Sequence, residues 1–420
     1  MRFVAALLVL AGLTAPAAAQ ADDEATMREL RRAYGELRQV AVDSHQEYPV
    51  VELVTMGVGS LIWERHGHIA LCLDYGGPRV DCYNYGVANF LHPIAMAAGF
   101  FRGTHSFWVA RMDPDEMLWV YVHADRTIWV QPLPLTMDQK KQVEQKLQSD
   151  IREENKYYAY DHFWDNCTTR VRDIIDHATG GALSSMKEPT DGRTYRDLAR
   201  AGFYGMKIPL LITDVAMGRV TDREPTYYER MFLPDYLREA VQKKWGVEPI
   251  AIYTRKGPPA SHDTSSGRFL FALVLLLLTS PAWATRLWGR FQRAGLAVAL
   301  VPQVILGAVF WFLAIISPLP YVRWNESCLV LIPLDLALLW LAPERRRVYA
   351  RIRVAMLGVI VLLMVVGVLV QPIWPEIVWP LVPCAVVGFW PHKEPAKTEE
   401  PTKSDKPPRR WGAQKKKKKK

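Results

Sequence analysis

The sequence YAYDHFWDNCTTR, residues 158–170, decides how the N-terminal part of the chain is interpreted, because it holds a candidate nucleophile at a helix start. Cys167 follows Asp165 and Asn166, two residue types that cap helices. The positive end of a helix stabilises a thiolate, and Arg170 on the next turn adds a positive charge. The thiolate is the nucleophilic form, so the pattern predicts a catalytic cysteine. The alternative is a buried cysteine that packs as a small apolar residue.

A catalytic cysteine needs a base, and RHGHIA, residues 65–70, supplies two histidines. His68 opens a strand pattern, and a histidine at a sheet edge facing a helix start is the arrangement of papain-like enzymes. His66 is the alternative base, because it lies two residues away and shares a face with His68 if the strand begins early. Since the histidine precedes the cysteine in the chain, the predicted arrangement is circularly permuted.

The returning strand of the hairpin, DCYNY at residues 81–85, is where a papain-like fold has the group that orients the histidine. We predict Asn84 for this role, with Tyr83 as the second choice.

The cysteines allow more than one interpretation. Cys72 and Cys82 are equidistant from the turn between the two strands, so they either form a disulfide or remain two reduced core cysteines. A disulfide would leave Cys167 as the free thiol of this part of the chain. A zinc site is the competing use of the His and Cys residues, but the C-x-x-C and H-E-x-x-H spacings are missing. We expect no metal and no cofactor.

Strand and helix patterns surround these motifs. Residues 22–43 carry apolar residues at helical spacing and predict an amphipathic surface helix. A further helix is expected at 138–152, with Thr136 as its cap. After an apolar stretch at 48–57, strands are expected at 69–74, 79–85, 106–112, 119–123 and 126–135. The sequence therefore predicts an α+β domain.

Residues 1–19 resemble a secretory signal. Arg2 precedes an apolar run, and Ala17-Ala18-Ala19 is a small-residue cleavage pattern. An uncleaved anchor is the alternative, and either version exports the residues after it. We therefore expect an exported, periplasmic domain at 20–256.

After residue 268 the chain becomes apolar in five runs, each near the roughly 17–25 residues that cross a bilayer. The predicted spans are 269–285, 294–316, 327–341, 354–370 and 373–390. They predict an all-α membrane domain of about five helices at 269–390, after a linker at 257–268. Asp335 in the third span is an ionisable residue in an apolar setting and a candidate site residue. Its alternative is a place at a helix end or against a neighbouring helix.

Charge predicts the topology. Arginines cluster in the first and third loops, at 286–293 and 345–353, so the positive-inside rule places these loops and the tail in the cytosol. The tail, 391–420, holds twelve Lys and Arg against four acids and explains most of the net charge of +9. A basic tail beside a nearly neutral remainder indicates contact with anionic lipid and argues against nucleic-acid binding.

Several motifs, in chain order, resemble the Lnb N-terminal periplasmic domain family. They are HGHIAL at 66–71, YNYG at 83–86, FRG at 101–103 and FWDNCTTR at 163–170. Arg126, Gln131 and LPLT at 133–136 also look like the family's intermediate stretch. The resemblance covers about residues 45–185.

The resemblance implies a bacterial lipoprotein N-acyltransferase, which moves an acyl chain from a phospholipid to the α-amine of a lipidated N-terminal cysteine. The family's cysteine and histidine correspond to Cys167 and His68. The implied exported fold is a permuted papain-like one, similar to NlpC and lecithin:retinol acyltransferase, in the periplasm of a multi-pass inner-membrane protein. Where the family usually has an aromatic residue before Gly67, this chain has His66.

A Cys–His pair suits this reaction. The thiolate takes the acyl chain as a thioester, and His68 accepts the proton of the attacking amine. The Cys167 amide and Asn166 are expected to stabilise the oxyanion. The candidates for substrate binding are His66, Tyr83, Arg170 and Asp335.

Two other functions remain open. A permuted NlpC-type peptidoglycan amidopeptidase would use the same Cys–His pair on wall peptides. A non-catalytic envelope assembly protein would need the cysteine only for structure. A phospholipid donor and a lipoprotein acceptor both reside in the membrane, which explains several spans, whereas a hydrolase of a soluble substrate would not need them.

Overall fold

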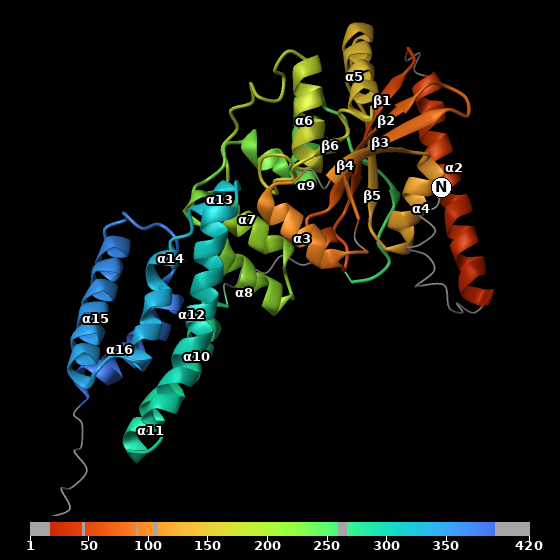
Figure 1. The fold of residues 1–420 in the computed structure, drawn as a ribbon. Helices are drawn as coiled ribbons and strands as arrows, with labels where there is room; N and C mark the ends of the chain where they lie inside the picture. The colour runs from red at the N-terminus through yellow and green to blue at the C-terminus, as the bar shows by residue number, and fades with distance from the viewer. Residues whose placement is uncertain (1–16, 44–46, 90, 105–106, 259–266, 391–420) are drawn as a thin grey trace, which may run out of the picture.

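The computed structural model describes residues 17–43, 47–89, 91–104, 107–258 and 267–390. Most of the predicted signal and linker, and the whole predicted tail, lie outside the described residues. Figure 1 shows two parts, a domain built on a β-sheet and a group of helices that extends away from it.

One sheet organises the first part. Its strands are all antiparallel to their neighbours, in the order β6-β4-β3-β2-β1-β5-β7. They are β1 (Val50–Met56), β2 (His68–Asp74), β3 (Val80–Ala88), β4 (Phe107–Met112), β5 (Ile128–Pro132), β6 (Tyr157–Tyr158) and β7 (Ile250–Tyr253). The middle strand of the sheet is β2. His68, its first residue, therefore lies at one end of the central strand.

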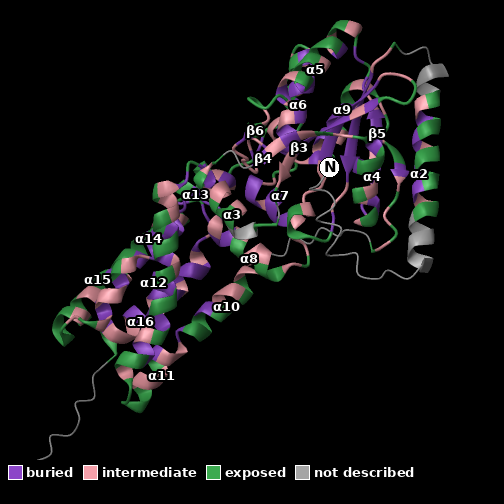
Figure 2. Cartoon of the chain, turned by 45° about the vertical axis from the view of Figure 1, so that its right-hand side comes forward, coloured by how far each residue is buried: buried purple, intermediate pink, exposed green. Residues whose placement is uncertain are grey.

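Helices cover both faces of this sheet, which confirms an α+β domain (Figures 1 and 2). α5, α6 and α9 pack on the face of Ile69 and Leu71, and α2 and α4 pack on the face of Ala70 and Cys72. The helices are α2 (Ala17–Asp43), α3 (Pro93–Arg102), α4 (Pro114–His123), α5 (Met137–Asp150), α6 (Cys167–Ala178), α7 (Tyr195–Gly202), α8 (Lys207–Ala216) and α9 (Pro234–Trp245). Short 3-10 helices are η1 (Ile62–Glu64), η2 (Arg219–Asp222) and η3 (Glu229–Phe232).

The predicted strand at 119–123 is wrong, because these residues end helix α4. The Asp113 side chain caps this helix, and a proline occupies its first position. Leu118 and Val122, one helical turn apart, are both buried. Five residues of alternating pattern do not distinguish a strand from a short helix, and the capping sequence decides the outcome.

α2 confirms the amphipathic helix predicted at 22–43. Its apolar stripe, Met27, Leu30, Tyr34 and Leu37, is buried against the sheet. Each such side chain contributes about 1.5–3 kcal/mol when fully buried.

The cysteines of the hairpin form a disulfide. Cys72 and Cys82 lie opposite each other in the β2–β3 register, and their sulfur atoms are bonded. Cys167 is therefore the free thiol of the sheet domain.

Among the described residues, three helical stretches are long and apolar enough to cross a membrane. They are α10 (Arg268–Leu278) with α11 (Ser280–Trp288), α12 (Gln292–Ile316) and α15 (Pro343–Val365). A shorter apolar helix, α16 (Trp374–Phe389), comes after them. Outward side chains such as Leu277, Ile315 and Val365 are exposed, as expected for helices that face lipid.

The predicted span at 327–341 is not one helix. It consists of α14 (Ser327–Val330) and the 3-10 helix η4 (Pro333–Leu339), which α13 (Pro320–Arg323) precedes. Two carbonyls of the irregular backbone still have partners, since Cys328 O accepts from Trp311 Nε1 at 3.1 Å and Val330 O accepts from Arg353. Backbone without regular structure at membrane depth requires such shielding by protein.

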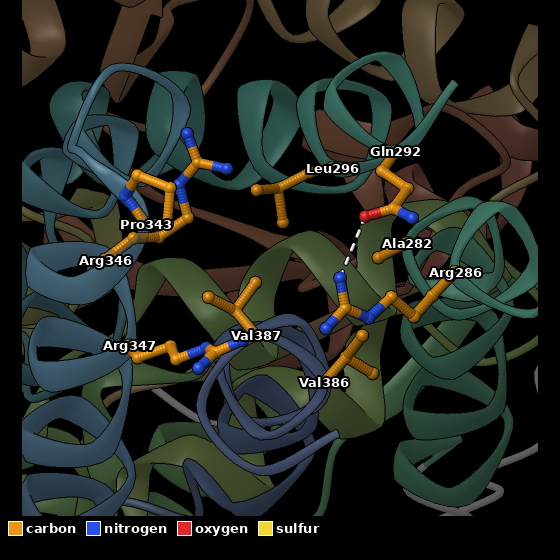
Figure 3. Close-up of a pocket in the computed structure, with 9 residues that line it drawn as sticks. All are labelled: Ala282, Arg286, Gln292, Leu296, Pro343, Arg346, Arg347, Val386 and Val387. Atoms are coloured by element: carbon orange, nitrogen blue, oxygen red, sulfur yellow. Dashed lines mark hydrogen bonds between the residues drawn. The ribbon is translucent and has the colours of Figure 1, made fainter. Parts of the chain in front are cut away.

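The ends of these helices fall into two groups. Near the sheet domain, Gly218 N donates to Tyr321 O, and Asn325 Nδ2 donates to Val215 O at 2.8 Å. At the other end the first loop, the third loop and the end of α16 meet around one pocket (Figure 3). This is the grouping of loops that the positive-inside rule predicts.

Candidate active site

Cys167 is the first residue of α6, and Asn166 caps the helix as predicted. Asn166 Oδ1 accepts from the Thr168 and Thr169 amides at 2.8 and 2.9 Å. Its Nδ2 donates to His162 O and Phe232 O. Because both ends of this side chain are engaged, Asn166 positions the helix start and does not have the free donor that an oxyanion site requires. Its predicted role in oxyanion binding is therefore not supported.

The strands leave room for the Cys167 sulfur at the end of β2. Pairing between β2 and β3 ends at Ala70 and Asn84. The amide of Ile69, the residue before Ala70, interacts with the sulfur. Gly86 has a φ of 85°, and a Cβ there would lie 3.6 Å from Cys167 Cβ. A larger residue with that backbone conformation would be strained, so the glycine allows β3 to pass beside the cysteine.

Burial raises the pKa of the Cys167 thiol above its usual value. The Thr168 hydroxyl and amide, the Ile69 amide and the positive charge of Arg126 act in the opposite direction, but burial outweighs them. The resting group is therefore a neutral thiol. This differs from the expectation that the helix end and Arg170 would hold a thiolate.

His68 lies beside Asn84, the residue predicted to orient it. His68 Nε2 is 3.2 Å from Asn84 Oδ1, and the imidazole stacks on the Tyr121 ring at a centroid distance of 5.8 Å. With Nε2–H donating to Asn84, the other nitrogen, Nδ1, carries the lone pair. Burial, and next the charge of Arg126, lower the pKa of His68 to about 4, so the ring is neutral.

No hydrogen bond among the described residues joins Cys167 Sγ to an imidazole, and its side-chain partner is Thr168 Oγ1 at 3.8 Å. His68 nevertheless adjoins Ile69, whose amide interacts with that sulfur. Both groups therefore lie near the same end of β2, although α6 packs on the sheet face of Ile69 and the His68 side chain belongs to the face of Ala70. Catalytic hydrogen bonds often tighten only when substrate binds.

Arg126 is a member of the site to which the sequence assigned no role in catalysis. It is 4% exposed, its Nε donates to Gly57 O at 2.7 Å, and its guanidinium lies 4.8 Å from the Tyr121 ring centroid. Its Nη2 is buried and has no hydrogen-bond partner among the described residues. The available signal in the sequence was a charged residue just before the apolar strand β5. Arginine is rarely buried unless it has a partner or a function, so a charge at this position marks a candidate site residue.

His66 does not lie in the same surroundings as His68. Its Nε2 is 2.8 Å from Ala199 O, and its ring makes edge contacts with His162 and Phe203. His66 therefore packs the start of β2 against α7. Its alternative role as the base is not supported.

Arg170 has structural partners, and Tyr83 lies on the other face of the sheet. Arg170 forms two hydrogen bonds with Asp165 and lies 3.7 Å over the Tyr158 ring. The pKa of the thiol is raised overall, and the arginine charge that opposes this rise is that of Arg126, not Arg170. Tyr83 is buried on the sheet face opposite Asn84 and so faces away from His68.

Asp335 lies within the membrane part. It pairs with Arg353 at 2.9 Å and accepts from Tyr349 Oη at 2.9 Å. Its side chain faces neighbouring helices, which is the alternative that the sequence left open. Among the described residues, no group of three or more His, Cys, Asp or Glu is arranged to hold a metal ion.

The loop before α6 contacts the membrane part directly. Phe163 makes an edge contact with Tyr321, with ring centroids 5.0 Å apart. Tyr160 interacts electrostatically with both Cys167 and Tyr321. Tyr160 therefore lies near both the thiol and the segment that joins α12 to α14.

Residues 39–201 match the family model described as the Lnb N-terminal periplasmic domain. The match includes β2 with His68, the segment with Arg126 and the start of α6 with Cys167. This confirms the resemblance inferred from the motifs. Searches of curated proteins and of solved structures found no match.

Proposed function

Given that residues 39–201 match the model of the Lnb N-terminal periplasmic domain family, we propose that the chain is a membrane-anchored thiol acyltransferase. Cys167 takes an acyl chain from a phospholipid and passes it to the N-terminal amine of a bacterial lipoprotein. In this proposal the sheet domain has a permuted papain-like arrangement on the periplasmic side of the inner membrane, with His68 before Cys167 in the chain.

The contact between the cysteine loop and the membrane part carries this proposal. Phe163 and Tyr321 join the segment just before Cys167 to the end of a membrane helix. A thiol held at that level lies close to where the ester of a bilayer phospholipid would be. Hydrolysis of a soluble wall peptide would not require this proximity.

In the first step His68 removes the proton of the Cys167 thiol as the sulfur attacks the ester carbonyl of the phospholipid. A carbon–sulfur bond forms, and the electron pair of the carbonyl moves onto its oxygen. When the tetrahedral intermediate collapses, the ester carbon–oxygen bond breaks. The imidazolium returns its proton to the leaving alkoxide, which departs as lysophospholipid.

In the second step a neutral amine attacks the thioester. A carbon–nitrogen bond forms, His68 accepts a proton from the nitrogen, and the carbon–sulfur bond breaks. The proton then returns to the sulfur, so the enzyme regains its thiol and the product is an amide. No other reactant is consumed.

The oxyanion of each step needs donors aimed at the carbonyl oxygen. We assign the buried Nη2 of Arg126 to this role, because it has no partner among the described residues and interacts with the sulfur electrostatically. The Cys167 amide at the helix end is the second donor. A full positive charge compensates the oxyanion better than the Asn166 amide would.

Exposed apolar residues around η1 and on α8 support a lipid donor. Leu61, Ile62 and Trp63 are each about half exposed, just before the His68 strand. On α8, Ile208 and Ile212 are 72% and 61% exposed and lie one turn apart. Such side chains are expected where a surface meets lipid.

An acyl-enzyme measurement tests the proposal. The full chain is purified with phosphatidylethanolamine, and intact mass spectrometry detects any adduct that hydroxylamine removes. We expect an adduct of one acyl chain on the wild type and none on Cys167→Ala. His68→Gln should slow adduct formation by about 100-fold or more, the usual contribution of a general base.

The same preparation is incubated with muropeptides and with a diacylated lipopeptide. Release of peptide fragments without an acyl adduct would replace the proposal with the amidopeptidase. Full activity of both variants in cells would leave the cysteine a structural role.

A further inference from the structure

A pocket lies between α11, α12, α15 and α16, at the end of the membrane helices away from the sheet (Figure 3). Its lining combines arginine and glutamine with aliphatic side chains, among them Arg286, Arg346, Arg347, Gln292, Leu296 and Val387. The proposed acyl transfer uses none of these residues.

The three arginines approach the pocket from different sides. Arg346 and Arg347 come from the start of α15 and Arg286 from α11, with Leu296 and Val387 between them (Figure 3). Of the described residues, no Asp or Glu lines the pocket or forms an ion pair with these arginines. Arg286 and Arg347 repel each other electrostatically. The pocket lining therefore concentrates positive charge, and Glu344 in the first turn of α15 is not part of that lining.

The hydrogen bonds of these arginines hold the groups in place without neutralising them. Arg286 donates to Gln292 Oε1 at 2.8 Å and to Trp390 O at 2.9 Å, and Arg346 donates to Leu341 O at 3.0 Å. The Nε of Arg286 and of Arg346 are buried without a partner among the described residues. Neutral acceptors thus fix the guanidinium groups while donors remain for a charged ligand.

We propose that this pocket binds the phosphate of an anionic phospholipid headgroup. Several guanidinium donors converging on one point match the oxygens of a phosphate. The aliphatic residues between them match the glycerol and first methylene groups of a lipid. Basic pockets between membrane helices on the cytosolic side are suited to such headgroups.

The positive-inside rule alone would not produce this arrangement. Arg290 and Arg345 lie at the same end, are exposed and do not line the pocket. They meet the charge requirement for orientation equally well. This makes Arg290→Gln with Arg345→Gln a matched control for Arg286→Gln with Arg347→Gln, since both remove two charges from one end.

The test uses the full chain in a neutral detergent and native mass spectrometry. Phosphatidylglycerol and phosphatidylcholine are titrated against the wild type, the pocket variant and the control. We expect phosphatidylglycerol to bind the wild type and the control with the same affinity. It should bind the pocket variant at least about tenfold more weakly. If the double variant folds poorly, Arg347→Gln alone should reduce binding in the same direction, because it replaces an exposed side chain at the pocket.

Inorganic phosphate separates two sources of the same chemistry. If phosphatidylglycerol stays bound in millimolar phosphate, the pocket recognises a lipid. Displacement by phosphate at that concentration would assign it to a free anion and overturn the proposal. Equal losses in pocket variant and control, or equal binding of phosphatidylcholine, would also overturn it. None of these results depends on whether Cys167 forms an acyl-enzyme.

Discussion

At the scale of single residues, Cys167 and His68 share a property that the sequence did not indicate: burial favours the neutral form of both. It raises the pKa of the thiol and lowers the pKa of the imidazole to about 4. A thiolate–imidazolium pair at rest is therefore disfavoured. Proton transfer is expected to accompany attack on the substrate, which protects an exported thiol from oxidation between reactions.

Alkylation of Cys167 by iodoacetamide tests this state. Because the pKa of the thiol is raised, the rate should rise with pH and reach half its maximum above about 8.5, the ordinary thiol value. Arg126→Gln should move that midpoint to still higher pH, since the arginine stabilises the thiolate. Peptide mass spectrometry measures the modified fraction. A midpoint below about 8 would mean that a stable thiolate exists.

Arg126→Lys tests the proposed oxyanion donor. Lysine keeps the charge but lacks the planar fork that bonds Gly57 O through Nε and leaves Nη2 free. Acyl-enzyme formation should fall by about 100-fold, the usual loss when an oxyanion donor is removed. The decrease should appear in kcat more than in KM, both for a phospholipid and for a soluble p-nitrophenyl ester.

Arg255→Lys is the matched control for Arg126→Lys. Arg255 Nη1 donates to Val58 O at 3.3 Å, so it supports the residue next to Gly57 without lining the cysteine site. Its replacement should leave both rates near the wild-type values. Equal losses in the two variants would assign Arg126 to the support of this loop alone.

At the scale of elements, α2 and β1 enclose an unusual carboxyl group. Glu52 is 1% exposed, and Tyr34 Oη donates to it at 2.5 Å across the interface between the helix and the sheet. Burial raises the pKa of Glu52 to about 7, although the Tyr34 hydrogen bond opposes this. A helix that begins at the predicted cleavage region is thus held over a group that titrates near neutral pH.

Glu52→Gln should therefore change how stability depends on pH. The folded state holds the Glu52 proton more tightly than the unfolded state, so this group's contribution is full below pH 4.5 and is lost as pH rises to about 7. Glutamine mimics the protonated acid. The variant should match the wild type near pH 4.5 and exceed it by about 3 kcal/mol above pH 7. Denaturant unfolding of the full chain in detergent measures the difference, and a pH-independent difference would contradict the assignment.

The sequence predicted the elements of the candidate site better than their contacts. Local signals, the caps at Thr136 and Asn166, give the starts of α5 and α6 correctly. Asn84 was identifiable because a hairpin register is set by its turn. Arg126 was not, because its approach to His68 depends on how β5 pairs beyond β1 and on where α4 packs, which no local pattern encodes.

The third membrane passage shows a second limit. Composition identified an apolar run of about the right length at 327–341, but hydropathy does not register that Pro333 interrupts it. The irregular backbone is tolerated because the Trp311 and Arg353 side chains on neighbouring helices bond its carbonyls. Those partners lie 17 and 23 residues away, outside any local window.

At the scale of the whole molecule, buried ion pairs join the sheet domain to the membrane helices. Asp214 on α8 pairs with Arg200 on α7 and with Arg268 at the start of α10. Arg65, just after η1, donates to Met206 Sδ at the start of α8. η1, α8 and the first membrane helix are therefore one connected unit, which holds the exposed side of α8 at the level where α10 begins.

This connection predicts that α8 helps the site to reach lipid. Ile208→Ser with Ile212→Ser removes two exposed apolar side chains without creating a core cavity. If they enter the bilayer surface, acyl-enzyme formation from phosphatidylethanolamine vesicles should fall by about tenfold or more, since each isoleucine contributes about 1.5–3 kcal/mol when fully buried. The rate with a soluble p-nitrophenyl ester should not change, because the chemistry at Cys167 is untouched. Ile250→Ser, at an exposed position on the edge strand β7, is the control and should affect neither rate. A loss with both substrates would instead show that α8 supports the site itself, because a defect in reaching the bilayer cannot slow a reaction that needs no bilayer.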